Sequence, residues 1–226
     1  MESHESWRHL ALLISILVLF VITPIAAMFP HGVLLLNVFA TVVLAAGSYA
    51  LFEHRRLFGI AVGWSAVSIL ATALLRFTQS HWASILSHAC VVVLVAFFSI
   101  SILAYVLRGG RVTVDRIFAA VCVYLLIGYA WTFAYALIEE LQPGSFAAAD
   151  GRSAAVTPGN YVDQVLEMRY FSFMTLTTVG YGDIVPHTSI ARTLAALEGI
   201  TGQVYLMVLV ARLVGLHIVH SSRPRS

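Results

Sequence analysis

The chain has 226 residues, of which 60% are hydrophobic and 11% are charged, and its formal net charge is +2. So much apolar surface cannot be buried inside a water-soluble domain of this length, which indicates an integral membrane protein. The small net charge gives no indication of nucleic-acid binding. We therefore expect an all-α membrane protein.

Six apolar runs are long enough to be membrane spans, since about 20 residues cross a hydrocarbon core of about 30 Å. In chain order they are Leu10–Phe29, Val33–Phe52, Leu57–Phe77, Ala83–Leu107, Val114–Ile138 and Ile190–Val219. No small-residue cleavage site follows the first run, so it is predicted to be an anchor rather than a signal peptide.

Arginine placement predicts the orientation, because cytoplasmic loops carry an excess of basic residues. All 13 basic residues are arginine. With the N-terminus inside, the cytoplasmic ends hold Arg8, Arg55, Arg56, Arg108, Arg111, Arg116, Arg212, Arg223 and Arg225. The outer side then holds Arg76, Arg152, Arg169 and Arg192. Six crossings place both termini in the cytoplasm, and the absence of lysine and of soluble domains suggests a bacterial inner membrane.

One long hydrophilic segment, from Glu139 to about Glu167, separates the fifth run from the sixth. Its Pro-Gly pairs are turn signals, so we expect an extracellular loop. The acidic side chains in it either form a negative vestibule that concentrates cations or only keep the loop in water. They are Glu139, Glu140, Asp150, Asp163 and Glu167.

The segment Thr177–Asp183 reads Thr-Thr-Val-Gly-Tyr-Gly-Asp and carries the strongest functional signal. It closely resembles the selectivity filter of the tetrameric potassium-channel family. In four copies around an axis, rings of backbone carbonyls can replace the water around a potassium ion. Gly180 and Gly182 reach the backbone angles that this needs without a Cβ penalty. The preceding Arg169–Leu176 is short, aromatic and amphipathic, as a half-membrane pore helix would be.

The resemblance covers roughly Val114–Val219 and implies a homotetrameric, potassium-selective channel in membrane lipid, with no nucleic-acid partner. It needs no cofactor besides potassium as the transported ion. The intact Tyr-Gly pair favours potassium over sodium. The metal-coordinating oxygens would be the backbone carbonyls and the threonine hydroxyl of Thr178, Val179, Gly180 and Tyr181, and Gly182 would complete the outer turn.

Three residues are expected to support the filter: Thr177, Asp183 and Glu198. Asp183 would anchor the outer end. An acid inside an apolar helix is costly and is a functional candidate by default, which singles out Glu198. We expect its carboxyl to bond to Thr175, to Thr177 or to the backbone behind the filter. The alternative is a carboxylate that faces a water-filled cavity.

The last helix also contains Gly199 and Gly202, which are candidate gating hinges. The alternative for both is close helix packing by small residues. Gln203 is expected to face the central cavity, where four amides would stabilise a hydrated cation.

The resemblance divides the chain into a four-helix peripheral domain, residues 1–109, and a pore domain, residues 110–226. Four helices before a pore suggest a voltage-sensor fold. A working sensor needs several arginines in the fourth helix, because each charge gains only about 2.3 kcal/mol per 100 mV. Ala83–Leu107 contains none, so we expect gating that does not depend on voltage.

Two other functions differ from this one in what they require of the sequence. A potassium transporter of related design carries four pore loops in one chain, whereas this sequence has a single Gly-Tyr-Gly. A non-conducting or regulatory subunit that co-assembles with other pore-forming subunits stays open. An enzyme finds no support, since there is no nucleophile elbow, phosphate loop or metal-spaced His/Cys cluster. Cys90 and Cys122 lie inside apolar runs and are expected to be packing residues.

Overall fold

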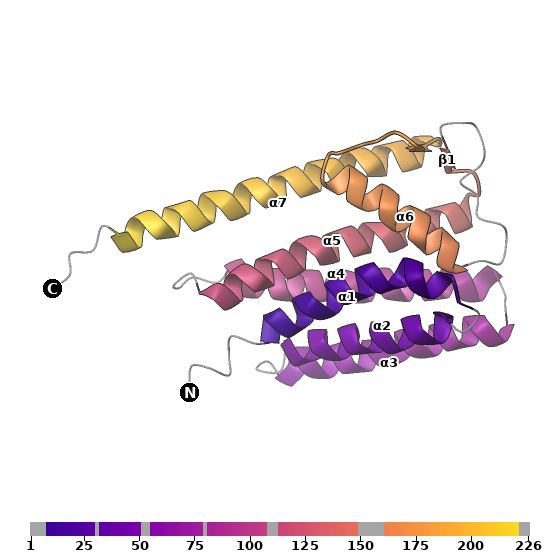
Figure 1. Cartoon of the computed structure of the whole chain (residues 1–226), viewed down its shortest axis with the longest axis horizontal. Helices are drawn as coiled ribbons and strands as arrows, with labels where there is room; N and C mark the ends of the chain where they lie inside the picture. Colours follow the sequence, from indigo (N-terminus) through magenta and orange to yellow (C-terminus); the bar gives the residue numbers. More distant parts are fainter. Residues whose placement is uncertain are drawn as a thin grey trace.

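The structure is a computed structural model that describes residues 8–29, 32–50, 55–78, 81–107, 113–148 and 161–221. Within these ranges the chain is mostly helical (Figure 1). Each of the six predicted apolar runs contains a helix, and the predicted pore helix is present but begins earlier, at Tyr161. The elements are α1 Arg8–Ala27, α2 Gly32–Ala50, α3 Arg55–Thr78, α4 His81–Leu107, α5 Val114–Leu141, β1 Phe146–Ala148, α6 Tyr161–Leu176, β2 Ile184–Pro186 and α7 Ser189–Ser221.

Four helices are long and apolar enough to cross a membrane, when only the described residues are considered. They are Arg8–Ala26, His81–Leu107, Val114–Leu141 and Ser189–Arg212. The protein is therefore a membrane protein. The second and third predicted spans are helical as α2 and α3, and their crossing of the membrane stays a prediction.

Helices α1 to α5 form one bundle in which α1 and α4 lie directly against α5, while α2 and α3 lie on the side away from α7 (Figure 1). Only residues 108–113 connect α4 to α5, so the two helices pack as an antiparallel pair. The apolar core contains residues from both predicted domains, 1–109 and 110–226. The division into these two domains stays a prediction. The buried members of the core include Leu12, Ile16, Leu94, Phe98, Ile102, Ala119, Val123 and Phe173.

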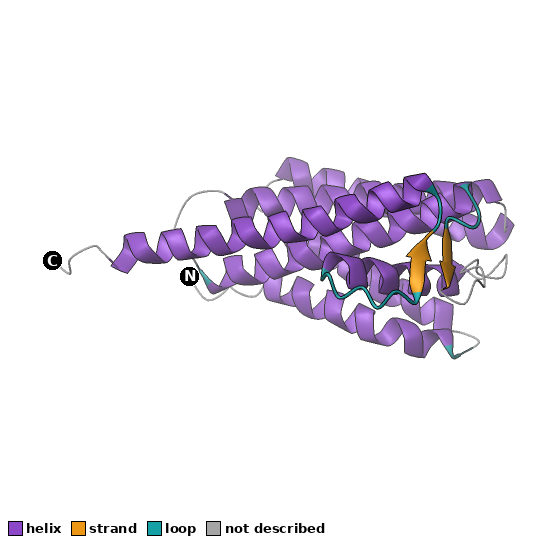
Figure 2. Ribbon diagram, turned by 90° about the horizontal axis from the view of Figure 1, so that it is seen from above, coloured by secondary structure: helices purple, strands orange, loops and turns teal. Residues whose placement is uncertain are grey.

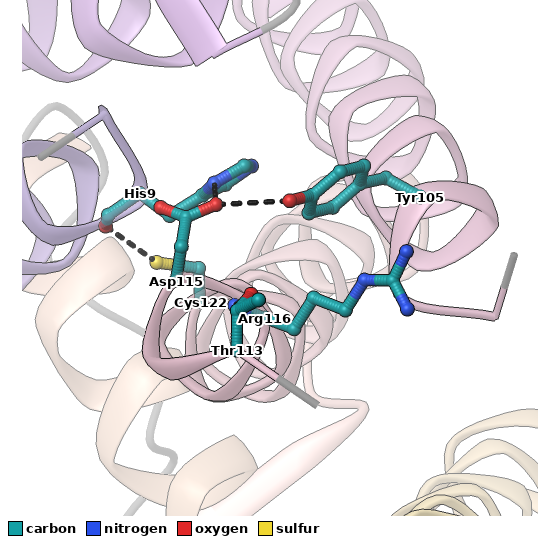
Figure 3. A network of polar contacts seen from close by, with 6 residues as sticks. All are labelled: His9, Tyr105, Thr113, Asp115, Arg116 and Cys122. Atoms are coloured by element: carbon teal, nitrogen blue, oxygen red, sulfur yellow. Dashed lines mark hydrogen bonds and ion pairs between the residues drawn. The ribbon is translucent and has the colours of Figure 1, made fainter. Parts of the chain in front are cut away.

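A buried polar network ties the start of α1 to the end of α4 and the start of α5 (Figure 3). His9 Nδ1 lies 2.7 Å from Asp115 Oδ2, and the Tyr105 hydroxyl donates to the same oxygen at 3.0 Å. The His9 and Tyr105 rings stack with centroids 4.9 Å apart, and the Cys122 thiol donates to the His9 carbonyl at 3.4 Å. Because a buried carboxylate is costly without such partners, this network holds α1 on α5.

The hydrophilic segment predicted from Glu139 to Glu167 is shorter in the structure, because α5 and α6 both extend into it. Strand β1 follows α5 and pairs antiparallel with β2, with Phe146 opposite Pro186 (Figure 2). This two-stranded sheet joins the loop after α5 to the chain that leaves the filter segment. Asp150 lies outside the described residues.

Glu139 does not have the exposed position that a vestibule acid needs. It is 5% exposed, and its carboxylate accepts hydrogen bonds from the backbone N–H groups of Gly144 at 2.7 Å and Phe146 at 3.0 Å. These N–H groups lie just beyond the end of α5, where no helical partner is available. The carboxylate therefore shapes the turn into β1, and the vestibule interpretation is wrong for this residue.

Candidate functional site

Hydrogen bonds from the first residues of the filter to the last carbonyls of α6 connect the two segments. The N–H groups of Val179 and Gly180 both donate to the Met174 carbonyl, at 2.9 and 3.1 Å, and the Thr178 N–H donates to Thr175 at 3.0 Å. Carbonyls at the end of a helix otherwise lack partners. These bonds turn the first N–H groups of the filter toward α6 and fix where the filter begins.

Every second residue of the filter has a positive φ: Thr178 at 59°, Gly180 at 54° and Gly182 at 77°. In an ordinary extended strand, successive residues face opposite sides. Alternating the sign of φ instead allows successive carbonyls to face one side. None of the backbone hydrogen bonds within the described ranges ends on the carbonyls of residues 178–181, so these oxygens are available to a ligand.

Thr178 is a strained position that the sequence did not predict. A β-branched residue at positive φ is an outlier, and such conformations cost of order 1–3 kcal/mol. Strain of this kind persists only where the surroundings enforce it, here through the bond from the Thr178 N–H to the end of α6. The glycine pattern predicted the other two positive angles.

Asp183 directly follows the filter, and its carboxylate lies near the Tyr170 hydroxyl of α6. The contact joins the exit of the filter to the middle of α6. The anchoring role of Asp183 stays a prediction.

Glu198 is completely buried and connects three helices behind the filter. Its Oε1 lies 2.5 Å from the Ser172 hydroxyl of α6, and its Oε2 accepts from the Tyr135 hydroxyl of α5 at 2.7 Å. The carboxyl thus contacts the pore helix, as expected, but not through the predicted residues. The Thr177 hydroxyl instead donates to the Phe173 carbonyl within α6.

The sequence contained a signal for the two partners that were missed. Tyr135 and Ser172 each place a hydroxyl inside an apolar helix, and a buried hydroxyl requires a partner. Both side chains are fully buried. Thr177 was a poor candidate because it sits at the exposed end of α6, where a threonine commonly bonds to the carbonyl four residues earlier.

Arg169 is a buried cation of α6. It is only 6% exposed, and its guanidinium carbon lies 4.4 Å above the centroid of the Phe20 ring. Its predicted place on the outer side of the membrane stays a prediction. The Phe20 ring of α1 also meets the Phe173 ring of α6 edge to face, 5.0 Å between centroids. A cation over a ring keeps part of its electrostatic stabilisation when water is removed. Helix α1 therefore packs against the pore helix as well as against α5.

The two glycines of α7 have different surroundings. A Cβ on Gly202 would lie 2.5 Å from the carbonyl oxygen of Leu176, the last residue of α6, whereas a Cβ on Gly199 would meet nothing within 4 Å. Gly202 is therefore a site of close packing, which was one of its two predicted roles. Hinge motion at either glycine stays a prediction. Gln203 is exposed, and its place in a central cavity also stays a prediction.

Comparison with known proteins agrees with this geometry. Residues 153–216, which include α6, the filter and most of α7, match the family model described as "Ion channel". Two Arabidopsis thaliana proteins are similar over a short region. Two-pore potassium channel 1 is 41% identical over 54 residues, which are 24% of this chain and 15% of that protein. Two-pore potassium channel 4 is 43% identical over 56 residues, which are 25% of this chain and 20% of that protein.

The matched region is thus a minor part of both plant proteins. No solved structure matches the chain significantly. The resemblance to the potassium-channel family that the filter sequence indicated is confirmed, and the similarity lies in the part of the chain that contains the filter.

Proposed function

We propose that the chain forms a potassium-selective channel, built from four identical six-helix subunits in the membrane. The observation that carries this proposal is the backbone of residues 178–182, with positive φ at alternate residues and carbonyls free to bind an ion. Rings of such carbonyls can take the place of the hydration shell of potassium. The names of the two similar plant proteins support the same ion.

The surroundings of the filter support an assembly of several subunits. Irregular backbone at membrane depth is tolerated only where protein buries it or where it lines a water-filled cavity. In the single chain the filter is exposed, with Val179 at 50% and Tyr181 at 73%. Further subunits would enclose it. Exposed apolar side chains along α7 add a surface for those contacts: Ile190, Leu197, Ile200, Val204, Leu206, Met207, Val208 and Val210.

We further propose that α2 and α3 cross the membrane together with the four helices identified above. Both termini would then lie in the cytoplasm, and the filter would be reached from outside. The excess of arginine at the proposed inner ends supports this orientation. We also propose a bacterial inner membrane as the location, because all 13 basic residues are arginine.

Selectivity is tested with the purified protein alone in a lipid bilayer. In mixed potassium and sodium solutions, we expect the reversal potential to follow the potassium gradient, because the filter carbonyls replace the shell of that ion. Equal permeability of the two ions would contradict potassium selectivity. Absence of any cation current from the pure protein would favour a regulatory subunit that needs other pore-forming chains.

Voltage should have little effect on gating. Helix α4 carries no Arg, Lys, Asp or Glu, and it packs directly on α5. One charge that crosses the membrane gains about 2.3 kcal/mol per 100 mV, and α4 has no such charge. The open probability should therefore change little between about −100 and +100 mV. Single-channel recording measures this quantity directly. A steep sigmoidal response, equivalent to several gating charges per tetramer, would show that a sensor lies elsewhere.

A further inference from the structure

The three short oxygen–oxygen contacts around Glu198 need more hydrogens than the hydroxyls of Ser172 and Tyr135 supply, if the carboxyl is ionised. Ser172 Oγ lies 2.5 Å from Glu198 Oε1 and 2.8 Å from the Gly128 carbonyl oxygen of α5. Tyr135 donates to the other carboxyl oxygen at 2.7 Å. Two oxygens this close attract each other only when a hydrogen lies between them.

Ser172 has one hydroxyl hydrogen and can donate to one acceptor at a time. An ionised Glu198 and the Gly128 carbonyl are both acceptors only, so one of the two Ser172 contacts would then lack a hydrogen. A proton on Glu198 Oε1 removes the conflict. Glu198 then donates to Ser172, and Ser172 donates to Gly128.

The surroundings of the carboxyl favour the same state. Glu198 is 0% exposed, and a buried ionised carboxylate is stable only with a cation or several donors. In the described part of the chain, the groups that bond to it are the hydroxyls of Ser172 and Tyr135, neither of which is a cation.

We infer that Glu198 is a neutral carboxylic acid whose proton completes a chain of hydrogen bonds from Tyr135 through Glu198 and Ser172 to Gly128. In this chain Tyr135 donates to Oε2 and the acid proton is donated to Ser172. Glu198 is then a positioning residue that joins α7 to α6 and α5 behind the filter without adding charge there. The inference goes beyond the proposed function, because it holds whichever ion the pore conducts.

The protonation of Glu198 is tested by infrared difference spectroscopy on the full-length protein in lipid at neutral pH. Subtracting the Glu198→Gln spectrum from that of the wild type should leave a carboxylic-acid C=O stretching band, which moves to lower wavenumber in D2O. Glu167→Gln alters a half-buried acid of α6 and serves as the control. Its spectrum should still contain the Glu198 band, so that subtracting it from the wild-type spectrum removes that band. A difference spectrum that contains only carboxylate bands overturns the inference.

Ser172→Ala gives a second readout if Glu198→Gln does not assemble. Removing the acceptor of the acid proton weakens its hydrogen bond, so the C=O band of the intact Glu198 should move to higher wavenumber. An unmoved band would show that Ser172 does not accept this proton and would overturn the proposed chain. Neither measurement depends on ion flux, so a failure of the proposed potassium conduction would be seen separately.

Discussion

Gly180→Ala is expected to abolish potassium flux while the protein still assembles. Gly180 has a φ of +54°, and a side chain in this left-handed region costs about 1–2 kcal/mol. Four subunits would carry about 4–8 kcal/mol of strain, which the filter can release by turning its carbonyls away from the ion path. Flux into potassium-loaded liposomes should therefore fall about 100-fold or more.

Gly144→Ala is the matched control, because Gly144 also has a positive φ, +85°, and also has open space around it. It lies in the turn before β1 and is not part of the filter. It should lower stability by a similar amount per subunit while leaving flux near that of the wild type. Normal flux through Gly180→Ala, or equal loss in both variants, would contradict the role assigned to the filter backbone.

Gly202→Ala is expected to have the second-largest effect. Its new Cβ would lie 2.5 Å from the Leu176 carbonyl oxygen, and a backbone atom at the end of α6 cannot move without shifting the start of the filter. Overpacking of this kind typically costs about 1–3 kcal/mol. We expect a lower melting temperature of the assembled protein, together with a flux reduced about tenfold or more.

Gly199→Ala provides the comparison within the same helix, since nothing lies within 4 Å of its added Cβ. Alanine favours a helix over glycine by about 1 kcal/mol, so this variant should be as stable as the wild type or more so. If Gly202→Ala melted like the wild type but gated differently, Gly202 would be a hinge rather than a packing site.

The sequence predicted the six long helices because each depends on a local property, a run of about 20 apolar residues. It also predicted the filter, since a motif of consecutive residues carries both the glycines and the carbonyls. Glu198 could be singled out for the same reason, as an acid inside an apolar run. Its partners could not be, because Ser172 lies 26 residues and Tyr135 lies 63 residues away along the chain.

What the amino-acid sequence by itself determined is therefore local: which segments are helical, where the filter lies, and why Gly180 and Gly182 are glycines. The tertiary structure decided which side chains meet. It buried Glu139 beneath a turn, set Gly202 against the end of α6, and held Thr178 at a positive φ. Such contacts arise from the packing of helices that are distant in sequence, and hydrophobic patterns specify which segments are buried without specifying which atoms touch.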